Sequence, residues 1–189
     1  GYIKTVVTGS AITPSMQKVV VKSAANAPLW GALYRQYFEE IQQVTASKGA
    51  LQVEKKLFVE RNNGQGIELQ PVTDGNPLHK GDKVIVRLTL RADRDMEYVH
   101  LKDLRAGCFE PTQQMAGSSY KDGLWMYHAP EDAAEHFFIH RLPKGTFVLE
   151  YAVYTERSGN YSGGISTIQC LYAPEFVSHT AGSKILVQD

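Results

Sequence analysis

The chain has 189 residues, with 20 basic and 20 acidic side chains, and hydrophobic residues make up 43% of it. A chain of this length can bury a sizeable core without disulfides or metal ions. The charge balance argues against a nucleic-acid-binding protein, because neutralising phosphates requires clustered Lys and Arg. No apolar run is long enough to span a bilayer, so we expect no direct membrane insertion.

The first part of the chain predicts a few strands that do not make a domain. The chain opens Gly1-Tyr2-Ile3-Lys4, without an initiator Met and already in strand-like sequence, which indicates a piece of a longer protein. Alternating patterns predict strands at Ile3–Thr8, Gln17–Ser23 and Leu29–Glu39. So few strands cannot form an independent sandwich. We therefore expect residues 1–46 to complete a sheet elsewhere, with a boundary near Ala46-Ser47-Lys48-Gly49-Ala50.

From residue 51 onward a period of two dominates the sequence. Val84, Val86, Leu88 and Leu90 alternate with mostly polar residues, as expected of a half-buried strand. Strands are predicted in the same way at Leu51–Glu60, Lys83–Arg91, Met96–Leu104, Glu135–Leu142, Gly145–Thr155, Gly164–Tyr172 and Lys184–Gln188. Pro130–His136 fits one short helical turn. The pattern predicts an all-β, antiparallel sandwich over residues 51–189.

Aromatic residues gather in the segment Ser118–Pro130, which is interpreted as a loop. Exposed Tyr and Trp are effective anchors for a protein partner. Tyr120, Trp125 and Tyr127 are therefore candidate partner-contact residues. The alternative is a strand that buries its Trp and Met in the ordinary way.

No catalytic, cofactor-binding or metal site is predicted. His136 and His140 are four residues apart, but on a strand they lie about 13 Å apart and cannot share one ion. We expect both to face solvent. No Gly-x-Ser-x-Gly elbow occurs, and Asp103 and Asp132 are interpreted as ordinary loop or strand-edge residues.

The two cysteines, Cys108 and Cys170, are too few for a disulfide framework. We expect two unpaired thiols, and the alternative is a single disulfide between Cys108 and Cys170. Cys108-Phe109-Glu110-Pro111 resembles the start of a Cys-x-Glu-Gln thioester pattern, but Pro111 has no side-chain carbonyl to accept the thiol. Neither cysteine can form that thioester locally.

Four sequence blocks stand out along the chain. They are Leu29-Trp30-Gly31-Ala32-Leu33-Tyr34-Arg35-Gln36-Tyr37-Phe38-Glu39, Asp93-Arg94-Asp95-Met96-Glu97-Tyr98-Val99-His100-Leu101-Lys102-Asp103, Leu142-Pro143-Lys144-Gly145-Thr146-Phe147-Val148-Leu149-Glu150-Tyr151, and Tyr172-Ala173-Pro174-Glu175-Phe176. Together these blocks resemble the C-terminal end of large bacterial alpha-2-macroglobulin-like proteins. The last two are the most specific, because they occur in order and at the family's spacing.

The resemblance implies two parts. Residues 51–189 would be the last macroglobulin domain, an immunoglobulin-like sandwich, and residues 1–46 the closing strands of a CUB-like domain. The bait region and the thioester domain of the family would both lie outside this segment. No family active-site residue maps onto these blocks.

The functional expectation is a non-enzymatic structural or interaction domain of an extracytoplasmic alpha-2-macroglobulin-like protein of the protease-inhibitor type. Its expected partners are neighbouring domains of that protein, and proteases through the full-length protein, with no nucleic acid and no cofactor. The parent would lie in the periplasm or at the cell surface, anchored to a membrane. The alternative is a stand-alone adhesion or carbohydrate-binding sandwich.

Overall fold

The computed structural model describes residues 3–24 and 26–189 of the chain. It contains two units, one ending at Tyr37 and the other running from Phe38 to Asp189. Gly1, Tyr2 and Ala25 belong to the predicted leading segment and lie outside the described residues.

The strands predicted before residue 46 are not formed in the described residues of that segment. Only short 3-10 turns occur there, η1 (Gly9–Ala11) and η2 (Pro14–Gln17), and a third, η3 (Ile41–Gln43), follows. Thr8 and Lys18 have extended backbone angles, but a strand also requires a neighbour that takes up its backbone hydrogen bonds. The prediction of strands at Ile3–Thr8, Gln17–Ser23 and Leu29–Glu39 is therefore wrong for the described residues of this segment. Among the described helices, none is long and apolar enough to cross a membrane.

The second unit is built from strands alone after η3, which confirms the all-β prediction. Their bounds are β1 Leu51–Asn62, β2 Ile67–Pro71, β3 Leu78–His79, β4 Lys83–Ala92, β5 Met96–Leu104, β6 Phe109–Pro111, β7 Gly117–Lys121, β8 Leu124–Glu131, β9 Ala134–Leu142, β10 Gly145–Thr155, β11 Gly159–Ser162, β12 Ser166–Cys170, β13 Val177–His179 and β14 Lys184–Gln188. The short helical turn expected at Pro130–His136 is wrong, because β8 and β9 form a hairpin there.

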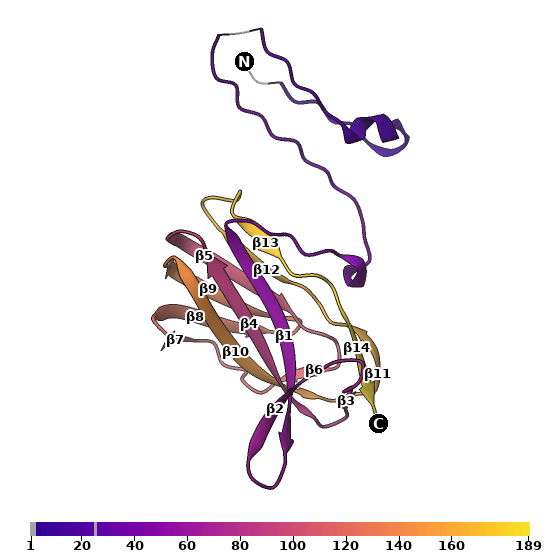
Figure 1. Cartoon of the computed structure of the whole chain (residues 1–189), viewed down its shortest axis with the longest axis vertical. Helices are drawn as coiled ribbons and strands as arrows, with labels where there is room; N and C mark the ends of the chain where they lie inside the picture. Colours follow the sequence, from indigo (N-terminus) through magenta and orange to yellow (C-terminus); the bar gives the residue numbers. More distant parts are fainter. Residues whose placement is uncertain (1–2, 25) are drawn as a thin grey trace. The chain divides into compact units, whose positions relative to one another are not determined.

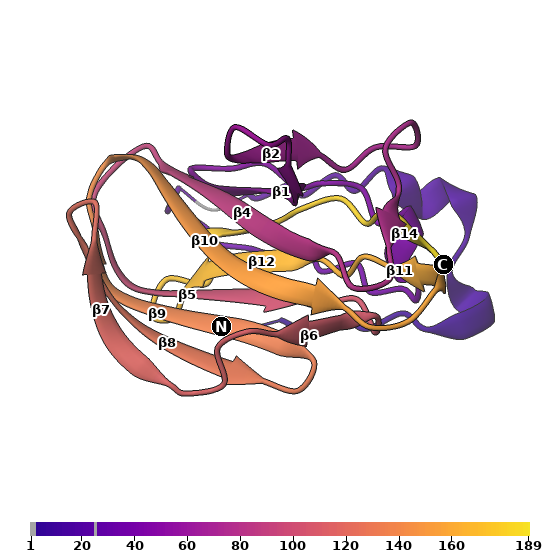
Figure 2. The ribbon, with the colours of Figure 1, turned by 90° about the horizontal axis from the view of Figure 1, so that it is seen from below.

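The strands form two facing sheets and a small closing sheet (Figures 1 and 2). The five-stranded sheet has the order β2-β1-β4-β10-β6, and the six-stranded sheet has the order β13-β12-β5-β9-β8-β7. The closing sheet, β11-β14-β3, holds the parallel pair β14 and β3. The other strand pairs of the described residues are all antiparallel, so the architecture is an antiparallel β-sandwich.

Two tight connections carry the chain from one sheet to the other. The link Asp93–Asp95 joins β4 to β5, and Pro143-Lys144 joins β9 to β10. Asp95 fastens the two links together, because its Oδ1 accepts the backbone N–H of Lys144 at 2.9 Å. These two links, here called the arches, hold β5 and β9 side by side opposite β4 and β10.

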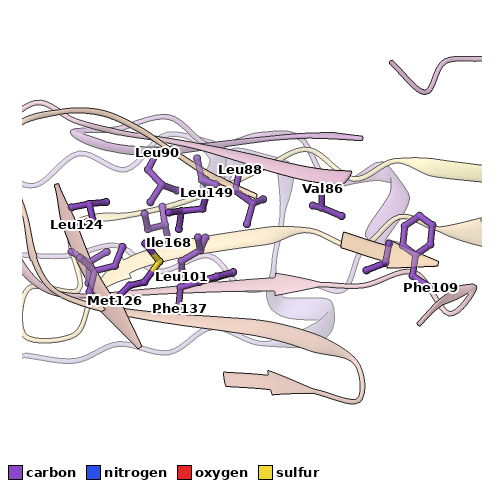
Figure 3. Close-up of a cluster of buried hydrophobic side chains, with 14 of the residues drawn as sticks. Val86, Leu88, Leu90, Leu101, Phe109, Leu124, Met126, Phe137, Leu149 and Ile168 are labelled. Carbon is purple, nitrogen blue, oxygen red and sulfur yellow. The ribbon is translucent and has the colours of Figure 1, made fainter. Parts of the chain in front are cut away.

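The core lies between the two sheets, where alternate residues of each strand point inward (Figure 3). Leu88 and Leu90 from β4, Leu101 from β5 and Ile139 from β9 belong to one core cluster, and all four are at most 1% exposed. Burying each such side chain stabilises the fold by about 1.5–3 kcal/mol. Since the inward positions are filled by apolar residues, the opposite positions of these strands face outward.

A segment before β1 is fastened to the sandwich. Residues 41–47, here called the strap, hydrogen-bond along the 179–182 loop: the Gly182 N–H donates to the Val44 carbonyl at 2.8 Å, and the Ser47 N–H donates to the His179 carbonyl at 3.0 Å. The strap passes so close that a Cβ on Gly182 would lie 1.8 Å from the Ile41 carbonyl oxygen. Only glycine fits at this position.

Candidate functional site

The outer face of the six-stranded sheet is aromatic. An antiparallel sheet with one face on the core normally presents polar residues to water on the other. Here the outward positions of the central strands β5, β9 and β8 carry Tyr98, His100, His136, Phe138, His140, Trp125 and Tyr127, and Tyr120 follows on β7. We call these eight residues the aromatic face.

Strand pairing places the rings in cross-strand rows. In the register, His100 lies opposite Phe138, and Phe138 lies opposite Tyr127. The His100 and Phe138 rings stack at 4.6 Å with an angle of 8°, and the His100 and His136 rings lie edge to edge, with centroids 5.1 Å apart and an angle of 14°. Tyr127 tilts against Phe138 at 6.4 Å. The row is thus held by ring contacts as well as by backbone hydrogen bonds.

The ring geometry shows how the row is arranged. The ring centroids of His136 and Phe138 are 6.2 Å apart, so these two rings do not lie on opposite faces of His100. Phe138 stacks on one face of His100, whereas His136 meets it edge to edge through two ring nitrogens that are 2.9 Å apart. Tyr120 and Trp125 meet at an angle of 44°, so neither of these rings lies flat on the other.

Beside the row lies an open hollow of about 370 Å³, lined by Tyr98, Trp125, Tyr127, His140 and other apolar side chains. Tyr98 has a backbone φ of 52°, an uncommon angle for a bulky residue. This conformation places its ring edge-on to both His140, at 4.7 Å, and Tyr172, at 5.0 Å. Backbone strain of this kind persists only where the surrounding structure holds it.

Of the predicted contact residues, Tyr120, Trp125 and Tyr127 are 61%, 65% and 46% exposed. The segment is a hairpin of β7 and β8 rather than a loop, with the turn at Asp122-Gly123. Met126 points into the core, but Trp125 does not, so the buried-Trp alternative is wrong. That these residues contact a partner remains a prediction.

The rest of the aromatic face was not predicted as a site. Tyr98, His100 and Phe138 lie on strands that were predicted, but no partner role was assigned to them. The sequence does contain a signal for this face. Phe138 occupies an outward position of a strand whose inward positions are also apolar. A strand that is apolar on both faces predicts a covered outer face.

The histidine prediction needs a correction. His140 is exposed as expected, but the His136 side chain is only 12% exposed, because it packs into the row. Its Nδ1 lies 2.9 Å from Nε2 of His100, and its Nε2 lies 3.4 Å from the Glu131 carboxylate. Burial above all, and then His136 and Lys102, lower the pKa of His100 below its ordinary value of 6.5.

Asp103, interpreted as an ordinary strand-edge residue, is instead fully buried between the sheets. Its carboxylate accepts hydrogen bonds from Lys55 Nζ at 2.8 Å, Tyr151 OH at 2.5 Å and Ser166 Oγ at 2.8 Å. Lys55 and Tyr151 belong to the five-stranded sheet, whereas Asp103 and Ser166 belong to the six-stranded sheet. This polar cluster therefore joins the two sheets through the core.

A second buried ion pair lies next to it on the six-stranded sheet. Arg105 donates to the Glu135 carboxylate, and Nε2 of His128 lies 2.5 Å from the other Glu135 oxygen. Arg105 also donates to the carbonyl of Asp132, at 2.8 Å, which lies in the β8–β9 turn as a loop residue. Apart from Arg105 Nε, which is buried without a hydrogen-bond partner, these buried groups bind one another, so their arrangement is that of a structural network.

The cysteines are unpaired and buried. Burial raises the pKa of Cys108 from 9.0 to about 11, and it also raises that of Cys170. A thiol in such surroundings is unreactive, since the thiolate is the nucleophile. Within residues 3–24 and 26–189, no group of three or more His, Cys, Asp or Glu is arranged to hold a metal ion.

The two facing sheets, with the arches between them, define a macroglobulin-type β-sandwich domain. Residues 51–175 match the sequence profile of the bacterial alpha-2-macroglobulin MG10 domain. The chain belongs to this family, as its sequence blocks predicted. No curated protein matches the sequence at a significant level.

Solved structures of bacterial alpha-2-macroglobulins have the same fold. Salmonella alpha-2-macroglobulin reacted with methylamine matches with a TM-score of 0.61 and 19% identity over 76% of this chain and 10% of that one. The Escherichia coli protein from domain MG7 to the C-terminus matches with 0.58 and 16%, over 76% of this chain and 24% of that one. The E. coli protein activated by porcine elastase gives 0.61 and 17%, over 77% of this chain and 14% of that one. The chain spans less than a quarter of each relative.

Proposed function

We propose that this chain is a non-enzymatic interaction domain of a larger, extracytoplasmic alpha-2-macroglobulin-like protein. Its aromatic face packs against a neighbouring domain of the same polypeptide. The observation that carries the proposal is the outer face of the six-stranded sheet, where Trp125 is 65% exposed beside Tyr120, Tyr127 and Phe138.

Exposed clusters of this kind have a physical cost that a partner removes. Contiguous apolar surface in water is unfavourable by about 25 cal/mol per Å², and large aromatic side chains contribute most of it. Aromatic residues are also the ones that dominate the binding free energy of protein interfaces. The aromatic face therefore favours a protein-covered surface over a solvated one.

A neighbouring domain is the occupant that the observations favour. The solved relatives are far longer than this chain, which covers 10% to 24% of them, so most of such a polypeptide would lie beyond this chain. The face also carries little charge, with Lys102 and Glu131 at its margin. A nearly neutral aromatic surface suits a permanent contact within one protein better than charge-steered capture of a ligand.

Residues 1–46 also favour a position of this chain beside another domain of the same polypeptide. We propose that residues 1–46 complete the sheet of a preceding CUB-like domain, with the boundary to the sandwich at residues 46–51. Apolar side chains along this segment are exposed, among them Ile3, Val21, Leu29, Trp30, Leu33 and Tyr34. A run of exposed apolar residues with strand periodicity calls for partner strands.

Protease contact belongs to the full-length protein in this proposal. One relative is described as activated by porcine elastase, and another as reacted with methylamine. For this chain, proteases are indirect partners, reached through domains that lie outside it. The alternative of a stand-alone carbohydrate-binding module is disfavoured because the chain matches a domain that forms part of far longer polypeptides.

Accessibility of Trp125 tests the proposal. Trp30→Phe leaves Trp125 as the sole tryptophan of this chain. Acrylamide quenching of Trp125 is compared between this variant and a full-length polypeptide in which every tryptophan other than Trp125 is replaced by Phe. Trp125 should be quenched readily in the chain and protected in the full-length protein. The control carries Trp30→Phe, Trp125→Phe and Tyr154→Trp, because Tyr154 is 47% exposed on the other sheet. Equal quenching of Trp125 in both proteins would exclude docking through this face.

A further inference from the structure

The aromatic face contains a histidine pair whose geometry depends on its proton count. Nε2 of His100 and Nδ1 of His136 are 2.9 Å apart, so one nitrogen donates an N–H and the other accepts it. Both rings also belong to the stacked row that Phe138 completes. The pair is thus part of the surface that the proposed function assigns to docking.

Charged and polar groups face the pair from each neighbouring strand. On β5 itself, Lys102 follows His100 on the outward face and lies opposite His136. From β12, Gln169 lies opposite His100 and Thr167 opposite Lys102. From β8, Ala129 lies opposite His136, and Glu131, whose side chain is 67% exposed, reaches His136 Nε2 at 3.4 Å.

The balance of these groups disfavours a fully charged pair. Glu131 faces only His136, and its exposure to water weakens its attraction for a proton there. Asp132 lies with Lys102 and Glu131 around a shallow hollow at the margin and is itself exposed. Lys102 adds a positive charge beside both rings. His100 therefore has no carboxylate partner among the described residues that contact it.

Proton counting gives the pair two distinct states. With no added proton, one imidazole N–H donates to the other ring nitrogen. With one added proton, the donor becomes an imidazolium and the same contact is kept as a charge-assisted bond. With a second proton, both facing nitrogens carry hydrogens, the hydrogen bond is lost, and two like charges face each other beside Lys102.

We infer that the His100–His136 pair is a proton-operated latch, which keeps the aromatic row in its docking arrangement and releases it when both rings are protonated. This inference rests on the proposed function, since what the latch controls is the contact with the neighbouring domain. Burial lowers the pKa of His100, and covering by a partner lowers it further. Docking is therefore complete above pH 6.5 and is lost as the pH falls through the lowered pKa.

Titration of this chain tests the latch directly. Two-dimensional ¹H–¹⁵N spectra of ¹⁵N-histidine protein report the protonation of each ring. His100 and His136 should titrate in two coupled steps, and the contacts between the rings of His100 and Phe138 should disappear at the second. His140, which makes no ring-nitrogen contact with the pair, serves as the internal control. Independent one-step titrations, or a stack that survives full protonation, would overturn the latch.

His136→Gln provides the matched variant, because an amide can still hydrogen-bond to His100 but cannot become charged. The lowered pKa of His100 should rise in this variant, and its titration should become a single step. An unchanged His100 titration would show that the two rings are not coupled.

Trp125 quenching in the full-length polypeptide, measured against pH, then separates the two proposals. Wild-type docking should weaken by as much as about tenfold per pH unit for each proton taken up. His136→Gln should have a shallower dependence. If Trp125 is protected at every pH, the latch is wrong while the docking function stands. If Trp125 is never protected, the docking function fails and the regulatory role fails with it.

Discussion

Asp103→Asn is expected to destabilise the sandwich strongly, because it removes the negative charge from the cluster that joins the two sheets. Lys55 has a side chain only 9% exposed, and it would keep the carbonyl oxygens of Leu104 at 2.9 Å and Gly163 at 3.2 Å. The asparagine cannot accept all the hydrogen bonds that Lys55, Tyr151 and Ser166 now donate. Removing one partner of a buried ion pair costs about 3–5 kcal/mol.

We expect a loss near the lower end of that range, about 3 kcal/mol, since Lys55 keeps those two carbonyl partners. For a protein of this size, such a loss lowers the melting temperature by roughly 6–12 °C. Urea unfolding followed by circular dichroism gives the free energy of unfolding, provided that the slope m is unchanged.

A double-mutant cycle with Lys55→Met identifies the cause. If the cost comes from an unpaired buried ammonium, Lys55→Met combined with Asp103→Asn should be clearly less destabilised than the sum of the two single variants. A loss below about 1 kcal/mol for Asp103→Asn, or additivity within about 0.5 kcal/mol, would refute this account.

Other predictions concern the core, the thiols and the strap. Leu88→Ala should cost about 2–5 kcal/mol in thermal or urea unfolding, whereas Leu186→Ala, at a position 46% exposed, should stay within about 0.5 kcal/mol. Between pH 9.0 and about 11 the Cys108 thiol ionises in the unfolded chain before it does in the fold, so the unfolding free energy should fall as pH rises, and Cys108→Ala should remove that part of the slope. Gly182→Ala would bring its Cβ within 1.8 Å of a strap carbonyl oxygen, so strap amides should lose hydrogen-exchange protection, whereas Gly117→Ala, with open space around it, should leave them unchanged.

Strands with a strong contrast between their two faces could be predicted from the sequence almost to the residue. Met96–Leu104, Gly145–Thr155 and Lys184–Gln188 have the predicted bounds. The hairpin of β7 and β8 was missed, because the outward Trp125 and Tyr127 are as apolar as the inward Met126. Without contrast between faces, period two cannot be recognised.

Contacts between distant strands could not be predicted in the same way. Nothing in its local sequence distinguishes Asp103 from an exposed strand aspartate, because its partner Lys55 comes from the other sheet. The leading strands failed for a related reason. Their pattern encodes a tendency to be extended, but a strand forms only where another strand lies beside it, and this part of the chain offers none among its described residues.

The closing sheet has a consequence for the order of events during synthesis. β14 completes the sandwich by pairing with β11 and, in parallel, with β3, whose residues are translated far earlier. Val187 lies opposite Leu78, and both are buried. A nascent chain on the ribosome therefore cannot close this end of the sandwich until residues 184–188 have emerged, and such late, long-range pairing slows folding. The two ends of the closing sheet therefore come together only after β14 has been made.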